Sequence, residues 1–143
     1  MSKRRINFDD PVLDHYTSNQ LRKIADYSMR KHLLSRWDGR CFLTGREIGE
    51  QDVHVAHYRD RAYMPLRYSV DNLKLINRWS NTFDSRVYDK ALYGPLSKHH
   101  FEYRGGLINL HGLEYVEWLE GDHERILFTK EKLIKVIEDA RIL

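Results

Sequence analysis

Residues 52–58 read DVHVAHY and residues 72–81 read NLKLINRWSN, and these two stretches decide the fold prediction. The first stretch alternates and carries β-branched valines, so it predicts a strand over residues 53–58. Residues 71–72, an aspartate and an asparagine, can each cap a helix, and the apolar spacing after them predicts a helix over residues 73–83. The expected order is therefore a strand that carries histidines, a loop, and a helix that starts at an asparagine.

Three polar side chains in this frame suit the hydrolysis of a phosphodiester bond. A neutral imidazole is the side chain best matched to take a proton from water near pH 7, and His57 would be that general base. Asn72 would hold the imidazole in its orientation and tautomer. One divalent metal, Mg²⁺ or Mn²⁺, would stabilise the leaving oxygen, and Asn81 would be one of its ligands. The plainer alternatives are a half-buried histidine, a helix cap and a surface amide.

The spacing between the two asparagines matches the HNH, or ββα-metal, nuclease motif. In many HNH sequences this segment reads Asn-Leu, two residues, Leu-Cys, two residues, Cys and then His or Asn. Here Asn77 and Ser80 stand at the two cysteine positions, and the upstream Cys-x-x-Cys knuckle is Cys41-Phe-Leu-Thr44. Because three of the four thiolates are missing, the sequence predicts no structural zinc. The knuckle itself is expected to persist as a short turn over residues 41–46, with apolar packing in place of the metal.

The residue before the expected base departs from the usual pattern. Typical HNH sequences carry Asp or His there as a metal ligand, whereas this chain carries Ala56, which cannot ligate. Side chains alternate along a strand, so Ala56 and His54 share one face and His57 points to the other. His54 is either a metal ligand that reaches around from that face or an ordinary strand residue, and both readings stay open. Asp84, one helical turn after Asn81, is a weaker ligand candidate.

Beyond the central motif, the chain resembles the phage recombination endonucleases of the NinG, or Rap, family. The matching segments are Cys41–Arg46, Ala56–Arg61, Leu66–Tyr68, Glu102–Ile108 and Val116–Glu120, within residues 27–141. The resemblance implies a metal-dependent endonuclease that acts on branched DNA, such as Holliday junctions, during phage recombination. It implies DNA as the partner, allows a homodimer, and implies a phage protein in the bacterial cytoplasm.

The composition is that of a globular chain that can bind nucleic acid. The chain has 143 residues, of which 41% are hydrophobic and 31% charged, with a formal net charge of +3. No apolar run approaches the roughly 18–20 residues that a membrane span requires, and no apolar stretch follows the basic start as in a secretory signal. The expectation is a cytoplasmic protein without a membrane. The single cysteine, Cys41, cannot form an internal disulfide.

The flanks of the motif predict helices and therefore an α+β fold that is mainly helical overall. Residues 17–19 supply N-cap side chains for a helical lead-in over residues 17–36. A helical tail is expected over residues 103–142, with one helix around residues 113–119 and a final helix capped by Thr129. The sequence predicts one domain over residues 1–143, built around a small ββα-metal core at about residues 40–86.

Basic residues around the motif are the expected DNA contacts. Between residues 22 and 46 they outnumber acidic ones, and more arginines flank the histidine strand. The phosphate contacts we expect are Arg59, Arg61, Arg67, Arg36 and Arg40. A basic run can also be no more than a solvated helix face.

Two further classes of function compete with a nuclease. A degenerate HNH fold could hold DNA or a protein without cutting, and the missing thiolates and the alanine before the base favour that reading. A phage structural or assembly protein is a weaker third reading. The general base, the orienting asparagine and the distal ligand all remain in the sequence, which favours the nuclease.

Overall fold

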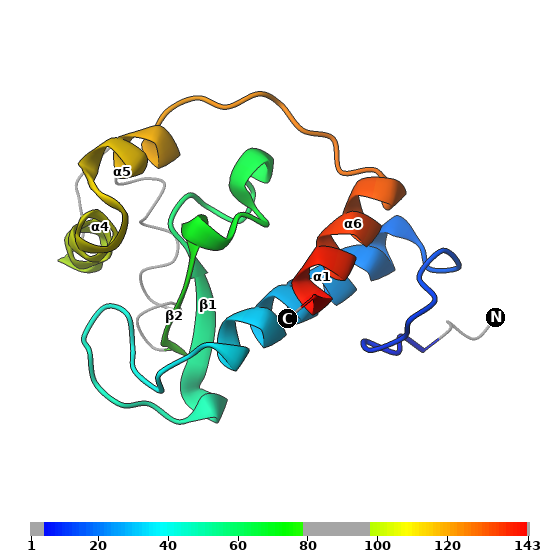
Figure 1. Cartoon of the computed structure of the whole chain (residues 1–143), viewed down its shortest axis with the longest axis horizontal. Coiled ribbons are helices and arrows are strands. Elements are labelled where there is room, and N and C mark those ends of the chain that lie inside the picture. The colour runs from blue at the N-terminus through cyan, green and yellow to red at the C-terminus, as the bar shows by residue number, and fades with distance from the viewer. Residues whose placement is uncertain (1–4, 79–97, 143) are drawn as a thin grey trace. The chain divides into compact units, whose positions relative to one another are not determined.

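The computed structural model describes residues 5–78 and 98–142, and it is a mixed α+β structure (Figure 1). The chain divides into two compact units. Unit 1 consists of Met1–Arg36 and Leu127–Leu143, and unit 2 consists of Trp37–Ile126. Within the described part of the chain, none of the helices combines the length and the apolar character needed to cross a bilayer.

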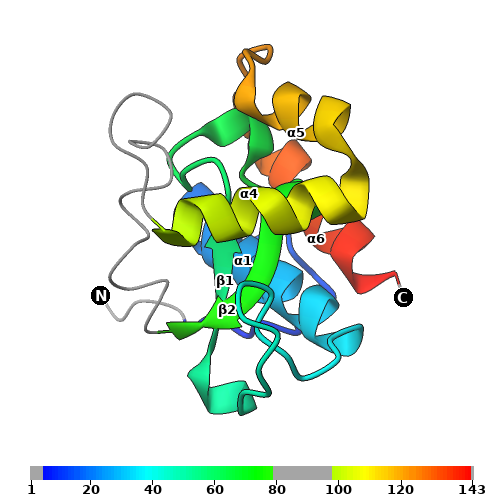
Figure 2. The same cartoon turned by 90° about the vertical axis from the view of Figure 1, so that its left-hand side faces the viewer.

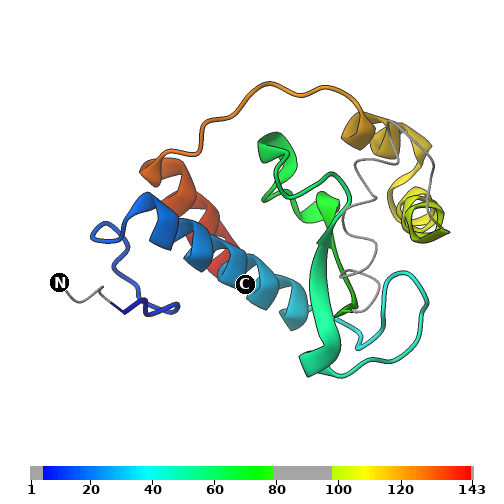
Figure 3. The same cartoon turned by 180° about the vertical axis from the view of Figure 1, so that it is seen from behind.

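Unit 1 is built on two helices that lie side by side, α1 (Ser18–Ser35) and α6 (Lys130–Arg141) (Figures 1 and 3). Thr17 caps α1 in a capping box with Gln20, and Thr129 caps α6 by accepting from the backbone N–H of Lys132. Both helices confirm the sequence prediction. Their starts were predictable because threonine side chains satisfy backbone N–H groups that the first turn leaves without partners.

The facing sides of α1 and α6 form the core of unit 1. Each helix turns a stripe with helical spacing inward, and the buried apolar residues are Leu21, Ile24, Ala25, Met29, Leu133, Ile137 and Ala140. The lead-in before α1 packs onto the same core through Leu13 and Tyr16, which are also buried. Burial of an apolar stripe every third or fourth residue supplies most of the stability of such a helix pair.

Unit 2 contains a two-stranded antiparallel sheet, β1 (Val53–His57) and β2 (Leu73–Asn77). The register pairs His57 with Leu73 and Val53 with Asn77. The strand β1 confirms the prediction, but the helix predicted from residue 73 is wrong, because residues 73–77 form β2. Arg78, which directly follows β2, has helical backbone conformation.

The error in β2 has a physical cause. Leu73, Leu75 and Ile76 are all buried, and this spacing fits a short buried strand as well as the first turn of a helix. Pairing with β1 decides between the two, and pairing is a long-range contact that local spacing does not contain. The predicted caps, Asp71 and Asn72, belong instead to a single 3-10 turn, η3 (Val70–Asn72).

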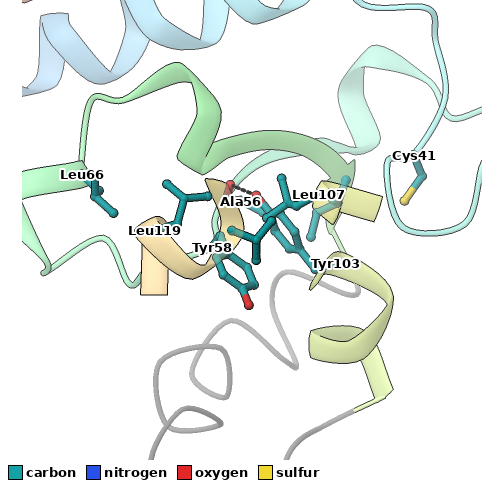
Figure 4. Close-up of a cluster of buried hydrophobic side chains, with 9 residues drawn as sticks. Cys41, Ala56, Tyr58, Leu66, Tyr103, Leu107 and Leu119 are labelled. Carbon is teal, nitrogen blue, oxygen red and sulfur yellow. Dashed lines mark hydrogen bonds between the residues drawn. The ribbon is translucent and has the colours of Figure 1, made fainter. Parts of the chain in front are cut away.

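Two helices follow in unit 2: α4 (Lys98–His111), which crosses one face of the sheet (Figure 2), and α5 (Leu113–Glu120). Gly112 separates them with a φ of 91°, a backbone conformation that favours glycine. The prediction had only one helix, around residues 113–119, in this part of the tail. The core between sheet and helices contains Ala56, Tyr58, Leu66, Ile76, Tyr103, Leu107, Val116 and Leu119 (Figure 4).

Candidate functional site

The expected base, His57, is the last residue of β1 and is half-buried. Its Nε2 lies 3.2 Å from the carbonyl oxygen of Arg67. A carbonyl oxygen can only accept, so this hydrogen bond forms when Nε2 carries the proton. In the neutral ring the other nitrogen, Nδ1, then has a lone pair that can accept a proton. The backbone of the loop therefore selects the tautomer in which His57 can act as a base through Nδ1.

Asn72 is fully buried and holds the loop between the two strands closed. Its Oδ1 accepts from the backbone N–H of Arg59 at 2.7 Å, and its Nδ2 donates to the Arg59 carbonyl at 3.2 Å. A third hydrogen bond runs from Nδ2 to the carbonyl of Leu66, also at 3.2 Å. These bonds extend the pairing of the strands by one residue and fix both ends of the loop.

Asn72 therefore acts on the imidazole only through the loop backbone. The sequence predicted that its side chain would orient His57, but its amide bonds to loop backbone, and the Arg67 carbonyl of the same loop contacts His57. Each buried peptide group left without a partner costs about 1–3 kcal/mol. Loss of the amide would therefore loosen the loop that holds the ring.

Arg59 is not the exposed phosphate contact that was expected. It is only 4% exposed, and its Nη1 donates to the carbonyls of Leu119 at 3.0 Å and Gly121 at 2.8 Å. These carbonyls lie at the C-terminal end of α5, where a cation is favoured by the helix dipole. The guanidinium also lies over the ring of Tyr63, 3.8 Å from its centroid. The expectation for Arg59 is therefore corrected: it joins the loop to α5.

The other predicted arginines are more accessible. Arg61 is exposed, while Arg67 is half-buried and its Nη1 lies 3.3 Å from the carbonyl of Arg61. Arg40 is exposed and forms an ion pair of 3.4 Å with Glu47. Arg36 is exposed at the end of α1 and belongs to unit 1, whereas the other three belong to unit 2. Arg59, Arg61 and Arg67 lie on the same loop as the carbonyl that contacts the imidazole, and of these three only Arg59 is buried.

The predicted metal ligands are only partly described. His54 is half-buried in β1, and the regular pairing of the strand puts it on the face of Ala56, opposite to His57. Asn81 and the weaker candidate Asp84 lie outside the described residues. Among residues 5–78 and 98–142, no group of three or more His, Cys, Asp or Glu side chains is placed to hold a metal ion. The structure thus gathers His57, Asn72 and Arg67, and it does not bring His54 to their side.

The predicted knuckle is present as a tight turn after Cys41. The backbone N–H of Gly45 donates to the Cys41 carbonyl, and the N–H of Phe42 donates to the Leu75 carbonyl, which attaches the turn to the outer edge of β2. The thiol of Cys41 is buried and accepts from the backbone N–H of Asn77 at 3.4 Å. Burial raises the pKa of this thiol, but the backbone N–H groups of Asn77, Thr44 and Leu43 and the hydroxyl of Thr44 together outweigh it, so the pKa is lowered overall.

The contact between Cys41 and Asn77 brings together two of the cysteine positions of the HNH motif described above. Cys41 is the first and Asn77 the third of the four positions where many HNH sequences carry cysteines. The Nδ2 of Asn77 also lies 3.6 Å from the Cys41 sulfur, so the amide occupies a position where a second thiolate would face the first. Apolar packing and this amide–thiol contact hold the knuckle against β2.

Two structurally important residues were missed from the sequence. Tyr103, fully buried on α4, donates its hydroxyl to the Ala56 carbonyl at 2.8 Å (Figure 4). Glu120 at the end of α5 accepts from the hydroxyl of Tyr58 and forms a bidentate pair with Arg104, at 2.9 and 3.2 Å. The aromatic residues could be recognised as core from their spacing, but their hydroxyl partners are distant in sequence.

Comparisons with protein-family models, with curated proteins and with solved structures give no match.

Proposed function

We propose that the chain is an HNH-type endonuclease that hydrolyses phosphodiester bonds in DNA with the help of one divalent metal. The observation that carries the proposal is the contact of His57 Nε2 with the Arg67 carbonyl at 3.2 Å. It leaves Nδ1 as the basic nitrogen of a half-buried ring at the end of a strand, which is the state that a general base requires.

The local architecture supports the same class. A strand ends in the histidine, a loop follows, and a fully buried asparagine precedes a second, antiparallel strand. The contact between Cys41 and Asn77 aligns the knuckle with the end of β2, as the HNH frame requires. Because residues 73–77 form a strand and not a helix, the order is strand, loop, strand, which is the order that the ββ part of a ββα-metal core would have.

The chemistry follows from the residues in their places. His57 Nδ1 takes a proton from the attacking water, and the Arg67 carbonyl stabilises the imidazolium that results, because it accepts from Nε2–H in both protonation states. Arg61 and Arg67 would contact phosphates of the DNA backbone. The metal, Mg²⁺ or Mn²⁺, would supply positive charge to the leaving oxygen when bound, with Asn81 and, from the opposite face of β1, His54 as its proposed ligands.

Branched DNA is the substrate that we propose. The proposal rests on the resemblance of residues 27–141 to the NinG, or Rap, family and on the exposed arginine at position 61. Cleavage of a four-way junction should therefore exceed cleavage of a linear duplex of the same sequence. Equal cleavage of both substrates would refute the preference for branched DNA but not the nuclease activity.

The first prediction concerns His57. Purified protein should cut junction DNA in the presence of Mg²⁺ or Mn²⁺, and His57→Ala should lose roughly 10²-fold or more of the rate, which is the usual contribution of a general base. DNA binding should survive, because arginine and lysine contacts to phosphate supply most of the affinity. The wild-type rate should rise with pH as the imidazole loses its proton, because only the neutral ring can act as a base. Cleavage by His57→Ala at the wild-type rate would refute the site.

A metal titration separates the base from a ligand. His54→Ala should be partly rescued by raising the Mg²⁺ or Mn²⁺ concentration, since mass action compensates for weaker metal binding. His57→Ala should not be rescued, because no amount of metal replaces the proton acceptor. Equal rescue of both variants would show that the separate roles assigned to the two histidines are wrong.

The second candidate function is a DNA- or protein-binding module without cleavage. Ala56 favours it, because this residue is fully buried in the core and stands where a metal-ligating acid or histidine is usual. Binding of junction DNA together with no cleavage by the wild-type chain at any metal concentration would select this candidate.

A further inference from the structure

The hydroxyl of Tyr103 lies at the backbone that carries His57. Tyr103 belongs to α4 and is fully buried, and its hydroxyl donates to the Ala56 carbonyl at 2.8 Å. The same oxygen lies 3.4 Å from the carbonyl of Asn72. The Ala56 carbonyl is part of the peptide group that continues into His57, so the hydroxyl acts directly on the plane of that peptide (Figure 4).

The hydroxyl also reaches both strands at the end where the site lies. Ala56 is one residue before the end of β1, and Asn72 is the residue before β2. The hydroxyl therefore lies near the end of β1 and the start of β2, between which the loop of residues 58–72 runs. A hydrogen bond between a buried hydroxyl and a carbonyl restrains the orientation of the carbonyl. If the carbonyl turned away, the buried hydroxyl would lose its partner, which costs free energy.

We propose that Tyr103 is a positioning residue for His57, which holds the Ala56–His57 peptide so that the imidazole meets the Arg67 carbonyl through Nε2. The catalytic consequence rests on the proposed nuclease function. Packing alone does not need the hydroxyl, since the ring contacts those of Phe42 and Tyr58 at centroid distances of 5.6 and 5.2 Å. The hydroxyl is thus the part of the side chain that controls the site.

Tyr58 provides a matched control. It is buried in the same aromatic cluster, and its hydroxyl donates to Glu120 rather than to the backbone near His57. Tyr103→Phe and Tyr58→Phe each remove one buried hydroxyl and keep the ring. In Tyr58→Phe the carboxylate of Glu120 keeps its bidentate partner, Arg104.

The experiment compares kcat, KM and the melting temperature of the two variants on junction DNA. Tyr103→Phe should lower kcat by about 10-fold, the upper end of what one neutral hydrogen bond supplies, with KM unchanged. Tyr58→Phe should keep kcat within about twofold, although it loses a hydrogen bond to a carboxylate and therefore at least as much thermal stability. Equal losses of kcat in both variants would overturn the proposal, because they would show a merely structural role.

A second measurement does not depend on cleavage. The ¹⁵N NMR shifts of the His57 ring report which nitrogen carries the proton, and the wild type and Tyr58→Phe should show Nε2–H. Tyr103→Phe should show a mixture of tautomers, because the ring is no longer held on the Arg67 carbonyl. Identical His57 spectra in all three proteins would overturn the positioning role. A wild type that cuts no DNA would refute the nuclease proposal alone, and the spectra would still decide the role of Tyr103.

Discussion

At the scale of single residues, the loop between the strands shows what burial does to a charge. Arg59 and Arg61 are two positions apart, yet one is buried against α5 and the other is exposed. A buried guanidinium persists only where carbonyls and an aromatic face replace water, and Arg59 has both. Its charge then acts on its neighbours, because a buried site screens charge less than water does.

His123 is one of these neighbours, and its titration should affect stability. Its Nδ1 lies 2.8 Å from the hydroxyl of Tyr63, on which Arg59 stacks. Burial lowers the pKa of His123 most, and the charge of Arg59 lowers it further, against smaller opposing effects from the Trp118 backbone and Asp122. The unfolded chain therefore binds a proton more readily here, so stability should fall as the pH falls through about 6.5 and below.

The measurement is the melting temperature of the wild type and of His123→Gln at pH 7.5 and pH 5.5. The wild type should lose more on acidification than His123→Gln, because the variant has no imidazole to protonate. The assignment fails if His123→Gln and the wild type lose equally.

At the scale of elements, α4 is pressed against the knuckle at one glycine. A Cβ built on Gly106 would lie 2.9 Å from two ring atoms of Phe42, whereas a Cβ on Gly105 would meet nothing within 4 Å. The two neighbouring glycines therefore differ in the space that a side chain would have. Only Gly106 permits the close approach of the helix to the turn that follows Cys41.

Alanine substitutions should separate the two glycines. Gly106→Ala should destabilise unit 2 by about 1–3 kcal/mol, because Phe42 must be displaced from its place against α4. Gly105→Ala should stabilise it by up to about 1 kcal/mol, the difference in helix propensity between alanine and glycine. Urea denaturation of the two variants and the wild type measures both effects. The same sign of change in both variants would contradict this packing.

The elements also show how far sequence reasoning reaches. Thr17, Thr129 and the alternation of residues 53–57 are local signals, and the elements they predict are present. The strand at residues 73–77 is stabilised by its partner strand, so local spacing misassigned it. Within the site, the sequence identified His57 and Asn72 as residues of interest. It did not predict that the Arg67 carbonyl contacts His57 or that Tyr103 contacts the Ala56 carbonyl, because these partners are distant in sequence. Arg59 was misread because burial is a property of the folded chain.

At the scale of the whole molecule, DNA affinity should depend on salt. Each phosphate contact releases counterions, so the logarithm of the binding constant should fall linearly with the logarithm of the salt concentration. Arg61→Ala should weaken binding of all DNA sequences alike and reduce that slope by about 1.

Filter binding or fluorescence anisotropy between low and high salt measures this slope. Lys135→Ala removes an equal charge from α6, where Lys135 forms an ion pair of 3.3 Å with Asp139, and should leave the slope unchanged. A wild-type affinity that does not vary with salt would argue against an electrostatic DNA contact.

Unit 1 combines an N-terminal and a C-terminal segment of the chain, and this affects how it folds during translation. The apolar face of α1 is buried by α6, yet all of Trp37–Ile126 must be translated between the two helices. At about 5–20 residues per second this delay is on the order of 5–20 s. During that interval α1 presents Leu21, Ile24 and Met29 without the helix that covers them. Unit 2 is continuous in sequence, so the nascent chain should be a client for holdase chaperones through α1 rather than through unit 2.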